Sequence, residues 1–265
     1  MDEAPHLLVE ETDGIIILTL NRPEKLNAIT WPMMDRFREA MARFRDTDEL
    51  KVMLIRATGR YFSAGADLRG GGGAEKRTAS GFREQHRRGA YGFQATWDEM
   101  EHIEKPFVIA HHAPCVGGGL EMSLSCDFRF AAKSASYSFP EGLFGSLPAS
   151  NGVSRLTRIC GPHWARWLIM ANKPASAELA FNMGLVHQVF PDETFQQEVM
   201  DFCRHLAKQN VEQMAAAKIA IELAVEVGRD SGRHVERMAN ASLMLNPAYN
   251  ERMAEYLSKL GGKGK

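Results

Sequence analysis

Short apolar runs and stretches of helical periodicity alternate along the first half of the chain. Residues 7–11 and 15–20 are predicted strands on either side of Thr12-Asp13-Gly14, and an Asp-Gly pair is typical of a tight hairpin turn. Thr30 is a residue type that caps helices, and a helix is expected to follow it. In that helix apolar side chains recur every three or four residues and define one buried face: Met34, Phe37, Met41 and Phe44.

The same alternation continues to residue 139. Buried strands are expected at residues 52–55 and 107–111, and two further strand-like pieces lie near 127–131 and 136–139. A glycine-rich turn at 117–119 opens a short helix. The second half of residues 76–104 is predicted to be helical and to end before Pro106, because four apolar side chains share one face: Phe93, Trp97, Met100 and Ile103.

From Ser150 onward the pattern is mainly helical, with one more strand predicted at 186–189 and only helices beyond Phe195. Strands that alternate with helices indicate an α/β fold with a largely parallel sheet. The last seventy or so residues have too little apolar face for a core of their own. We therefore expect this helical segment to pack on a neighbouring subunit.

Composition narrows the classes of function. Of the 265 residues, 45% are hydrophobic and 25% charged, and the formal net charge of −1 gives no reason to expect nucleic-acid or anionic-membrane binding. No apolar run approaches the roughly 20 residues that span a bilayer, and the acidic start lacks the features of a signal peptide. The four cysteines form no CxxC pair, which favours reduced thiols in a cytoplasmic protein and no zinc site.

Three segments carry candidate chemistry. Gly117-Gly118-Gly119 follows a strand and opens a helix, so its backbone N–H groups have no partners within the helix and a ligand can approach them; Glu121 lies one turn further on. The loop from Tyr61 to Leu68 is rich in small residues, and Phe139-Pro140-Glu141-Gly142 places a carboxylate on a stiff turn. Taken singly, each segment is better explained by a tight turn or a solvated glutamate.

Taken together, these segments resemble the enoyl-CoA hydratase/isomerase (crotonase) superfamily in their order and spacing. The resemblance covers almost the whole chain, and several motifs are in register. The motifs are NRPEKLNA at 21–28, SAGADL at 63–68, GGGLEMSLSCDFRFAA at 117–132, FPEGLFGSLP at 139–148 and AFNMGLVHQVF at 180–190.

The resemblance implies a fold and an assembly. It implies a crotonase-like spiral of ββα turns over residues 1–195 and a C-terminal helical region over 196–265 that builds homotrimers, often paired into hexamers. The family's oxyanion hole maps onto the backbone N–H groups of Ala66 and Gly118.

The resemblance also implies a reaction. The two glutamates of the family's hydratases map onto Glu121 and Glu141, which would hold one water and add it to the double bond of a 2-enoyl-CoA. Glu121 would activate the water and Glu141 supply the proton, although the pair titrates as a unit and the two roles stay open. No separate cofactor is expected, because coenzyme A enters as part of the substrate. It would lie along two segments: Lys25 and Leu26, and the loop Ala64, Ala66, Asp67 and Leu68. Lys25 is either a phosphate contact or a solvated side chain.

Some features depart from the family pattern. His111 and His112 stand where many hydratases have VNGYAL, and adjacent strand residues point to opposite faces, which favours packing over a shared metal. Ala149 lies where relatives have glycine. Residues 70–90 hold four glycines and a basic stretch, which is either a lid over substrate phosphates or a solvated helix face.

Three functional hypotheses follow. The first is a 2-enoyl-CoA hydratase. The second is a double-bond isomerase or an aromatic enoyl-CoA hydratase-lyase of the same superfamily. The third is a binding protein that contacts RNA on this scaffold, which the absence of a lysine-rich helix disfavours.

Overall fold

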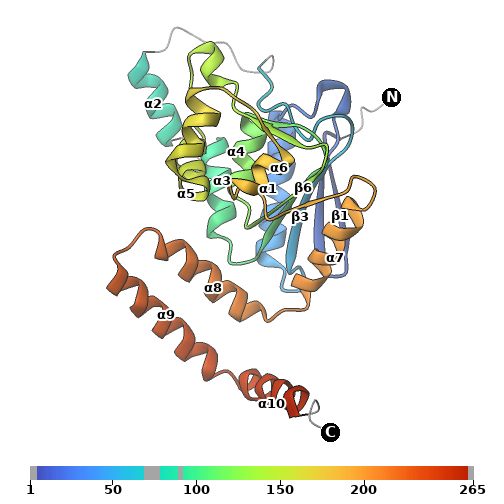
Figure 1. The fold of residues 1–265 in the computed structure, drawn as a ribbon, viewed down its shortest axis with the longest axis vertical. Helices are drawn as coiled ribbons and strands as arrows, with labels where there is room; N and C mark the ends of the chain where they lie inside the picture. Colours follow the sequence, from blue (N-terminus) through green and yellow to red (C-terminus); the bar gives the residue numbers. More distant parts are fainter. Residues whose placement is uncertain (1–4, 69–77, 89–91, 262–265) are drawn as a thin grey trace. The chain divides into compact units, whose positions relative to one another are not determined.

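The computed structural model describes residues 5–68, 78–88 and 92–261. The chain forms two compact units, an N-terminal unit (Met1–Lys208) and a C-terminal unit (Gln209–Lys265). Figure 1 traces both units along the chain. The predicted glycine run at 70–73, with Lys76 and Arg77 of the basic stretch, lies outside the described residues. Arg83, further along that stretch, is exposed on helix α2 (Ala79–Arg88).

A six-stranded sheet organises the N-terminal unit, in the order β1-β2-β3-β4-β6-β9. Only the β1–β2 pair is antiparallel among the pairs described in this sheet, and its register runs from Leu7 opposite Leu20 to Thr12 opposite Ile15, as the Asp-Gly turn predicted. The largely parallel α/β sheet is therefore confirmed. The strands are β1 (Leu7–Thr12), β2 (Ile15–Leu20), β3 (Val52–Ala57), β4 (Phe107–His111), β6 (Phe128–Ala132) and β9 (Gln188–Phe190).

A small second sheet, β5-β7-β8, was not predicted as a sheet. Its strands are β5 (Cys115–Val116), β7 (Ser136–Ser138) and β8 (Ala175–Ser176). Two of them are only two residues long, too short for any periodicity to register in the sequence. The strand β5 nevertheless matters, because it delivers the chain directly to the glycine-rich turn.

Both faces of the six-stranded sheet are covered, which explains why its strands are apolar almost throughout. Alternate residues such as Ile16, Leu18 and Ile55 join the main core with Phe37 and Phe44 of helix α1 (Trp31–Asp46). Helix α7 (Phe195–Ala207) packs against strands β2, β3, β4 and β6 on the N-terminal unit's sheet. As predicted, the Thr30 side chain caps α1 by accepting a hydrogen bond from the Met33 amide.

The remaining helices of the N-terminal unit surround the strand ends. The α-helices are α3 (Phe93–His102), α4 (Gly118–Leu124), α5 (Gly152–Ala165) and α6 (Ala177–Asn182). Gly161, directly before Pro162, has a φ of +75°, and α5 is kinked there. Shorter turns are η1 (Pro23–Lys25), η2 (Glu141–Phe144) and the π-helical turn η3 (Arg166–Met170).

The C-terminal unit is helical, as expected. It contains α8 (Val211–Ala224), α9 (Arg229–Met244) and α10 (Pro247–Gly261), and successive helices contact each other. Large apolar side chains such as Leu245 and Leu257 are exposed. Helix α7, which the sequence analysis grouped with these helices, belongs to the N-terminal unit.

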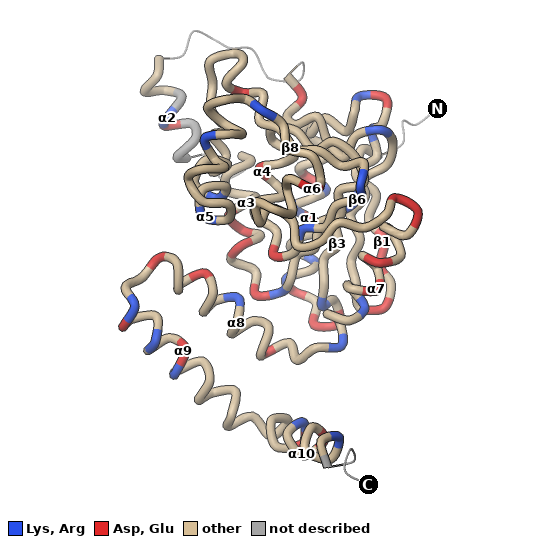
Figure 2. Tube along the Cα trace, viewed as in Figure 1, with Lys and Arg blue, Asp and Glu red and all other residues tan. Residues whose placement is uncertain are grey.

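Basic and acidic residues both occur in each unit. Figure 2 shows Lys and Arg interspersed with Asp and Glu along the chain. Within the part of the chain that the structure describes, no helix has the length and hydropathy needed to cross a bilayer.

Candidate active site

The N-terminus of α4 carries the first pair of candidate groups. Gly117 has a φ of +52°, and its amide donates to the Ser138 carbonyl at 3.0 Å while its carbonyl accepts from the Glu121 amide at 2.9 Å. Gly118 is the first residue of the helix, so its amide has no intrahelical acceptor. Over the described residues, that N–H donates to no other group. A backbone donor is thus left available.

The loop after β3 supplies a second available donor. Ile29 forms a parallel bridge with Ala66: its amide donates to the Gly65 carbonyl at 2.8 Å, and its carbonyl accepts from the Asp67 amide at 3.0 Å. In a parallel bridge the neighbours make both bonds, and the central residue's own N–H points away from the partner. The Ala66 amide therefore also donates to no described residue.

The two available amides lie side by side. A Cβ atom built on Gly118 would be 3.3 Å from the Ala66 nitrogen, and one built on Gly65 would be 3.0 Å from the Gly118 nitrogen. Gly65 has a φ of +91°, a conformation that side chains rarely adopt. Small residues here allow the two loops to approach, as the sequence predicted. The Phe93 ring lies 3.6 Å from the same Gly118 position and forms one wall.

Buried hydrogen bonds fix the shape of the Ala66 loop. The Ser63 hydroxyl donates to the Asn27 carbonyl at 2.9 Å and accepts from the Gly65 amide at 3.1 Å. Asn27 is fully buried, and its side chain bonds the carbonyls of Thr58 and Tyr61. These contacts hold the Ala66 backbone in place without using the Ala66 side chain. The NRPEKLNA and SAGADL motifs therefore act as one structural unit.

Glu121 projects from the buried helix α4 and is only 4% exposed. Its Oε1 accepts a hydrogen bond from the Ser150 amide at 2.7 Å. Burial raises the pKa of Glu121 from its usual 4.5 to about 7; the Ser150 and Gly152 amides oppose this rise, and the Glu141 charge adds to it. A carboxyl group with this pKa exchanges its proton readily near neutral pH.

Glu141 begins η2 on the opposite loop and is partly buried. A Cβ built on Gly117 would lie 2.8 Å from its Oε1, which places the carboxylate against the start of α4. Its Oε2 is buried and accepts no hydrogen bond from any described residue. Burial raises the pKa of Glu141 as well. The structure thus brings together the four predicted residues Ala66, Gly118, Glu121 and Glu141.

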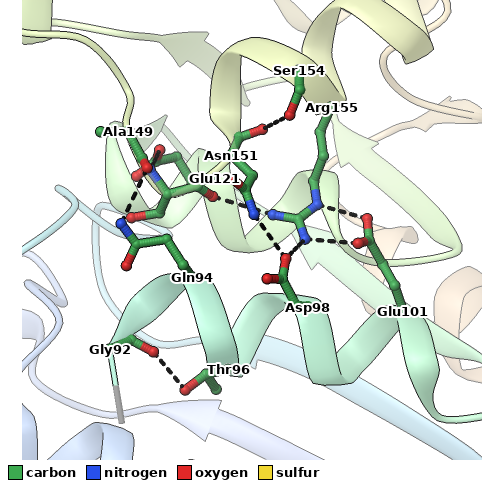
Figure 3. A network of polar contacts seen from close by, with 11 residues as sticks. Gly92, Gln94, Thr96, Asp98, Glu101, Glu121, Ala149, Asn151, Ser154 and Arg155 are labelled. Carbon is green, nitrogen blue, oxygen red and sulfur yellow. Dashed lines mark hydrogen bonds and ion pairs between the residues drawn. The ribbon is translucent and has the colours of Figure 1, made fainter. Parts of the chain in front are cut away.

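A polar network behind Glu121 was missed by the sequence analysis. Figure 3 shows Arg155 of α5 reaching Asp98 and Glu101 of α3, beside the loop that contains Ser150. Arg155 is buried, as are the apolar residues Leu156 and Cys160 of the same helix. An arginine on an otherwise apolar helical face was the available signal, because a buried charge requires partners.

The proposed coenzyme A residues fall on two adjoining segments. The Ala64 amide donates to the Leu26 carbonyl at 2.9 Å, which joins the turn after η1 to the Ala66 loop. Lys25 is exposed at the end of η1, and Leu68 is 81% exposed. The Asp67 carboxylate pairs with Arg22 at 2.6 Å, so its role is at least partly structural.

The two adjacent histidines point in different directions, as predicted for strand neighbours. His111 is fully buried, and its Nδ1 lies 3.2 Å from the Tyr137 hydroxyl, whereas the His112 Nε2 contacts the Gly59 carbonyl at 2.7 Å. Burial lowers the pKa of His111 to about 3, so its ring is neutral. The described residues contain no cluster of three or more His, Cys, Asp or Glu arranged to hold a metal ion.

Comparison with known proteins decides the family. The model of the enoyl-CoA hydratase/isomerase family matches residues 10–262. The chain belongs to the enoyl-CoA hydratase/isomerase family. A carnitinyl-CoA dehydratase of Salmonella enteritidis is 36% identical, over 86% of this chain and 81% of the relative. A mitochondrial enoyl-CoA hydratase of Pongo abelii is 28% identical, over 92% of this chain and 81% of the relative.

Solved structures of this family share the fold. An enoyl-CoA hydratase subunit of Geobacillus kaustophilus matches with a TM-score of 0.87 at 28% identity, covering 96% of this chain and 95% of that one. The enoyl-CoA hydratase of Bacillus anthracis also reaches 0.87, at 26% identity and 96% of both chains. The predicted crotonase fold is therefore confirmed.

The raised pKa of Glu121 predicts a dependence of stability on pH. Between about pH 4.5 and 7 the folded chain keeps a proton on Glu121 that the unfolded chain has lost, so the free energy of unfolding falls as the pH rises. The full shift corresponds to on the order of 3 kcal/mol. Glu121→Gln, which cannot ionise, should gain in melting temperature relative to the parent between about pH 5 and pH 8. A difference that stays constant over that range contradicts the assignment.

Proposed function

We propose that this protein is a 2-enoyl-CoA hydratase that adds water across the double bond of the acyl group. The observation that carries the proposal is the convergence of two unpaired backbone amides with the buried carboxyl group of Glu121 and the partly buried carboxyl group of Glu141. Family membership favours acyl-CoA thioesters as the substrates. The 36% identical dehydratase and the 28% identical hydratase are both named for reactions in which water is added or removed.

The amides of Ala66 and Gly118 would receive the thioester oxygen. Attack at the β-carbon shifts electrons towards this oxygen and creates an enolate, whose negative charge two N–H donors stabilise. Because both donors are already fixed by the bonds around them, they need little reorganisation when the charge forms. Glycine at 118 and alanine at 66 leave room for the thioester.

The carboxyl pair would handle the water. One group must take a proton from the water as it attacks, and the other must deliver a proton to the α-carbon. Two nearby carboxyl groups with raised pKa values favour a pair that shares a proton near neutral pH. In this scheme Glu121 is the base and Glu141 the acid, and Phe93 contacts the acyl group.

Coenzyme A would run along the two joined segments, with Lys25 and Leu26 on one side and Ala64 to Leu68 on the other. The hydrogen bond between Ala64 and Leu26 supports one continuous surface there. Exposed Lys25 is available to a phosphate group. The proposed reaction needs no separate cofactor, because coenzyme A is part of the substrate.

Turnover of enoyl-CoA thioesters tests the proposed reaction directly. The purified protein should consume crotonyl-CoA or a longer or aromatic enoyl-CoA, measured by loss of the enoyl thioester absorbance. Carnitinyl-CoA belongs in the panel because of the dehydratase relative, and its dehydration would be measured by a gain of that absorbance. Glu121→Gln and Glu141→Gln should each reduce kcat by roughly 100-fold or more, because hydration needs both groups.

Product analysis separates the alternatives. A shifted double bond, with one glutamate dispensable, identifies an isomerase, and cleavage of the hydrated product of an aromatic substrate identifies a hydratase-lyase. Absence of turnover on every enoyl-CoA tested rules out the hydratase. Retention on RNA at physiological salt identifies the binding-protein alternative.

A substitution at Gly118 isolates the contribution of one backbone donor. Gly118 is the first helical residue, a position that tolerates proline, and proline has no N–H. Gly118→Pro should lower kcat by roughly 100- to 1000-fold relative to Gly118→Ala, which adds a Cβ but keeps the amide. Circular dichroism should show that both variants are folded. Equal kcat in the two variants would exclude the Gly118 amide from catalysis.

We also propose that the chain assembles into homotrimers or hexamers through its C-terminal helical region. Helices α8 and α9 contain no buried residue, and apolar side chains such as Leu245, Tyr256 and Leu257 are exposed. A surface of this kind is covered in most proteins by another subunit. Family members of known structure have the same C-terminal helices within the matched fold.

Light scattering coupled to size-exclusion chromatography tests the assembly. The expected mass is three or six times that of the 29.6 kDa chain. Replacing Leu245 and Leu257 by Asp should move the mass towards that of one chain, whereas the parent protein eluting as a monomer at micromolar concentration contradicts the proposal.

A further inference from the structure

Arg155 is a buried cation that touches a single loop and a single helix. It is 5% exposed. Its Nε lies 2.6 Å from Glu101 Oε1, and its Nη2 lies 2.7 Å from Glu101 Oε2 and 2.5 Å from Asp98 Oδ1. The remaining nitrogen, Nη1, donates to the Ser150 carbonyl at 3.2 Å. Two carboxylates of α3 thus form a socket, and the guanidinium projects from it towards the loop.

The same helix holds the loop before and after Ser150. The Gln94 amide donates to the Ala149 carbonyl at 3.2 Å, and the Asn151 side chain donates to Asp98 at 2.8 Å. Figure 3 shows these contacts together with those of Arg155. Three consecutive residues of the loop are therefore tied to α3, and the central tie passes through Arg155.

The loop around Ser150 in turn holds the carboxyl group of Glu121. The Ser150 amide donates to Glu121 Oε1 at 2.7 Å, and a Cβ built on Gly152 would lie 2.9 Å from the same oxygen. Arg155 fixes the carbonyl side of Ser150, while the amide side of Ser150 fixes Glu121. We propose that Arg155 is a positioning residue, which keeps the Ser150 amide aligned with the Glu121 carboxylate through a socket formed by Asp98 and Glu101.

This inference rests on the proposed function only in assigning Glu121 to the reaction; the alignment itself is independent of the substrate. An N–H bond to a carboxylate favours its charged form, so a loosened Ser150 amide should leave Glu121 harder to ionise. The charged groups around Glu121 are Glu141 from η2, and Arg155 of α5 with the Asp98 and Glu101 carboxylates of α3 that neutralise it.

A purely structural role for Arg155 makes a different prediction. If it only clamped α3 to α5, its loss would lower the melting temperature and leave the ionisation of Glu121 unchanged. The test therefore needs a measurement of that ionisation that does not depend on turnover. Carbon-13 NMR of the glutamate carboxyl groups supplies one, and Glu121→Gln identifies the Glu121 signal by its disappearance.

The experiment compares Arg155→Met, which keeps the length of the side chain, with Arg155→Lys and with Arg129→Met. Arg129 is also a buried arginine, but it bonds the carbonyls of Leu185 and Cys126. Arg155→Met should raise the NMR-detected pKa of Glu121 by about one unit. Arg155→Lys should recover part of the shift, because an ammonium cannot match the fork geometry of a guanidinium. Arg129→Met should leave the pKa of Glu121 unchanged.

Kinetics give the second readout. With an enoyl-CoA as substrate, kcat of Arg155→Met should fall by roughly 10- to 100-fold, while KM should change by less than about threefold. The acidic limb of the pH profile should move upwards with the NMR pKa. If Arg155→Met does not fold, Gln94→Ala loosens the same loop from its Ala149 side and should shift the pKa in the same direction by a smaller amount.

Unchanged Glu121 ionisation in folded Arg155→Met, or in Gln94→Ala where that variant stands in, overturns the inference. So does an equal shift in Arg129→Met. If the parent protein hydrates no enoyl-CoA but the NMR shift appears, the proposed function fails and the positioning role of Arg155 stands.

Discussion

Two main-chain N–H groups, those of Ala66 and Gly118, donate to no acceptor among the described residues and lie side by side. Gly118 is buried, and leaving a buried donor unpaired costs about 1–3 kcal/mol, whereas Ala66 is exposed. Ordinary secondary structure leaves each donor available. Ala66 is the central residue of a parallel bridge, and Gly118 is the first residue of a helix. The loops that carry them can meet because glycine stands at 65 and 117, both with positive φ.

The carboxyl groups are subject to the opposite constraint. Glu121 is buried far enough for its pKa to rise to about 7, and this burial weakens the fold progressively as the pH rises from about 4.5 to 7. The surrounding amides limit the cost, since the Ser150 N–H stabilises the charged form. Stability is thus reduced at the carboxyl group to which the proposed reaction assigns a proton transfer, and such a loss is common at functional sites.

Much of this arrangement could be predicted from sequence. The hairpin, the Thr30 cap and the parallel strands follow from turn chemistry and periodicity. The four site residues follow from the resemblance to the family, because each segment alone has an ordinary structural explanation. The second sheet could not be predicted, because a two-residue strand such as Cys115–Val116 has no period. The socket for Arg155 was equally hidden: Asp98 and Glu101 lie over fifty positions away in the chain, and each looks like an ordinary solvated acid until α3 and α5 are placed together.

The parallel bridge between Ile29 and Ala66 has a consequence for how the protein tolerates genetic change. Since the exposed donor is a main-chain atom, missense changes at position 66 leave it in place unless they introduce proline or a side chain too large for the gap. The sensitive positions are instead the neighbouring Gly65 and Asn27, which make no contact with substrate in the proposed site. Their backbone torsion angles and buried hydrogen bonds hold the segment around Ala66 in register. Loss-of-function alleles should therefore cluster at residues that never touch a substrate.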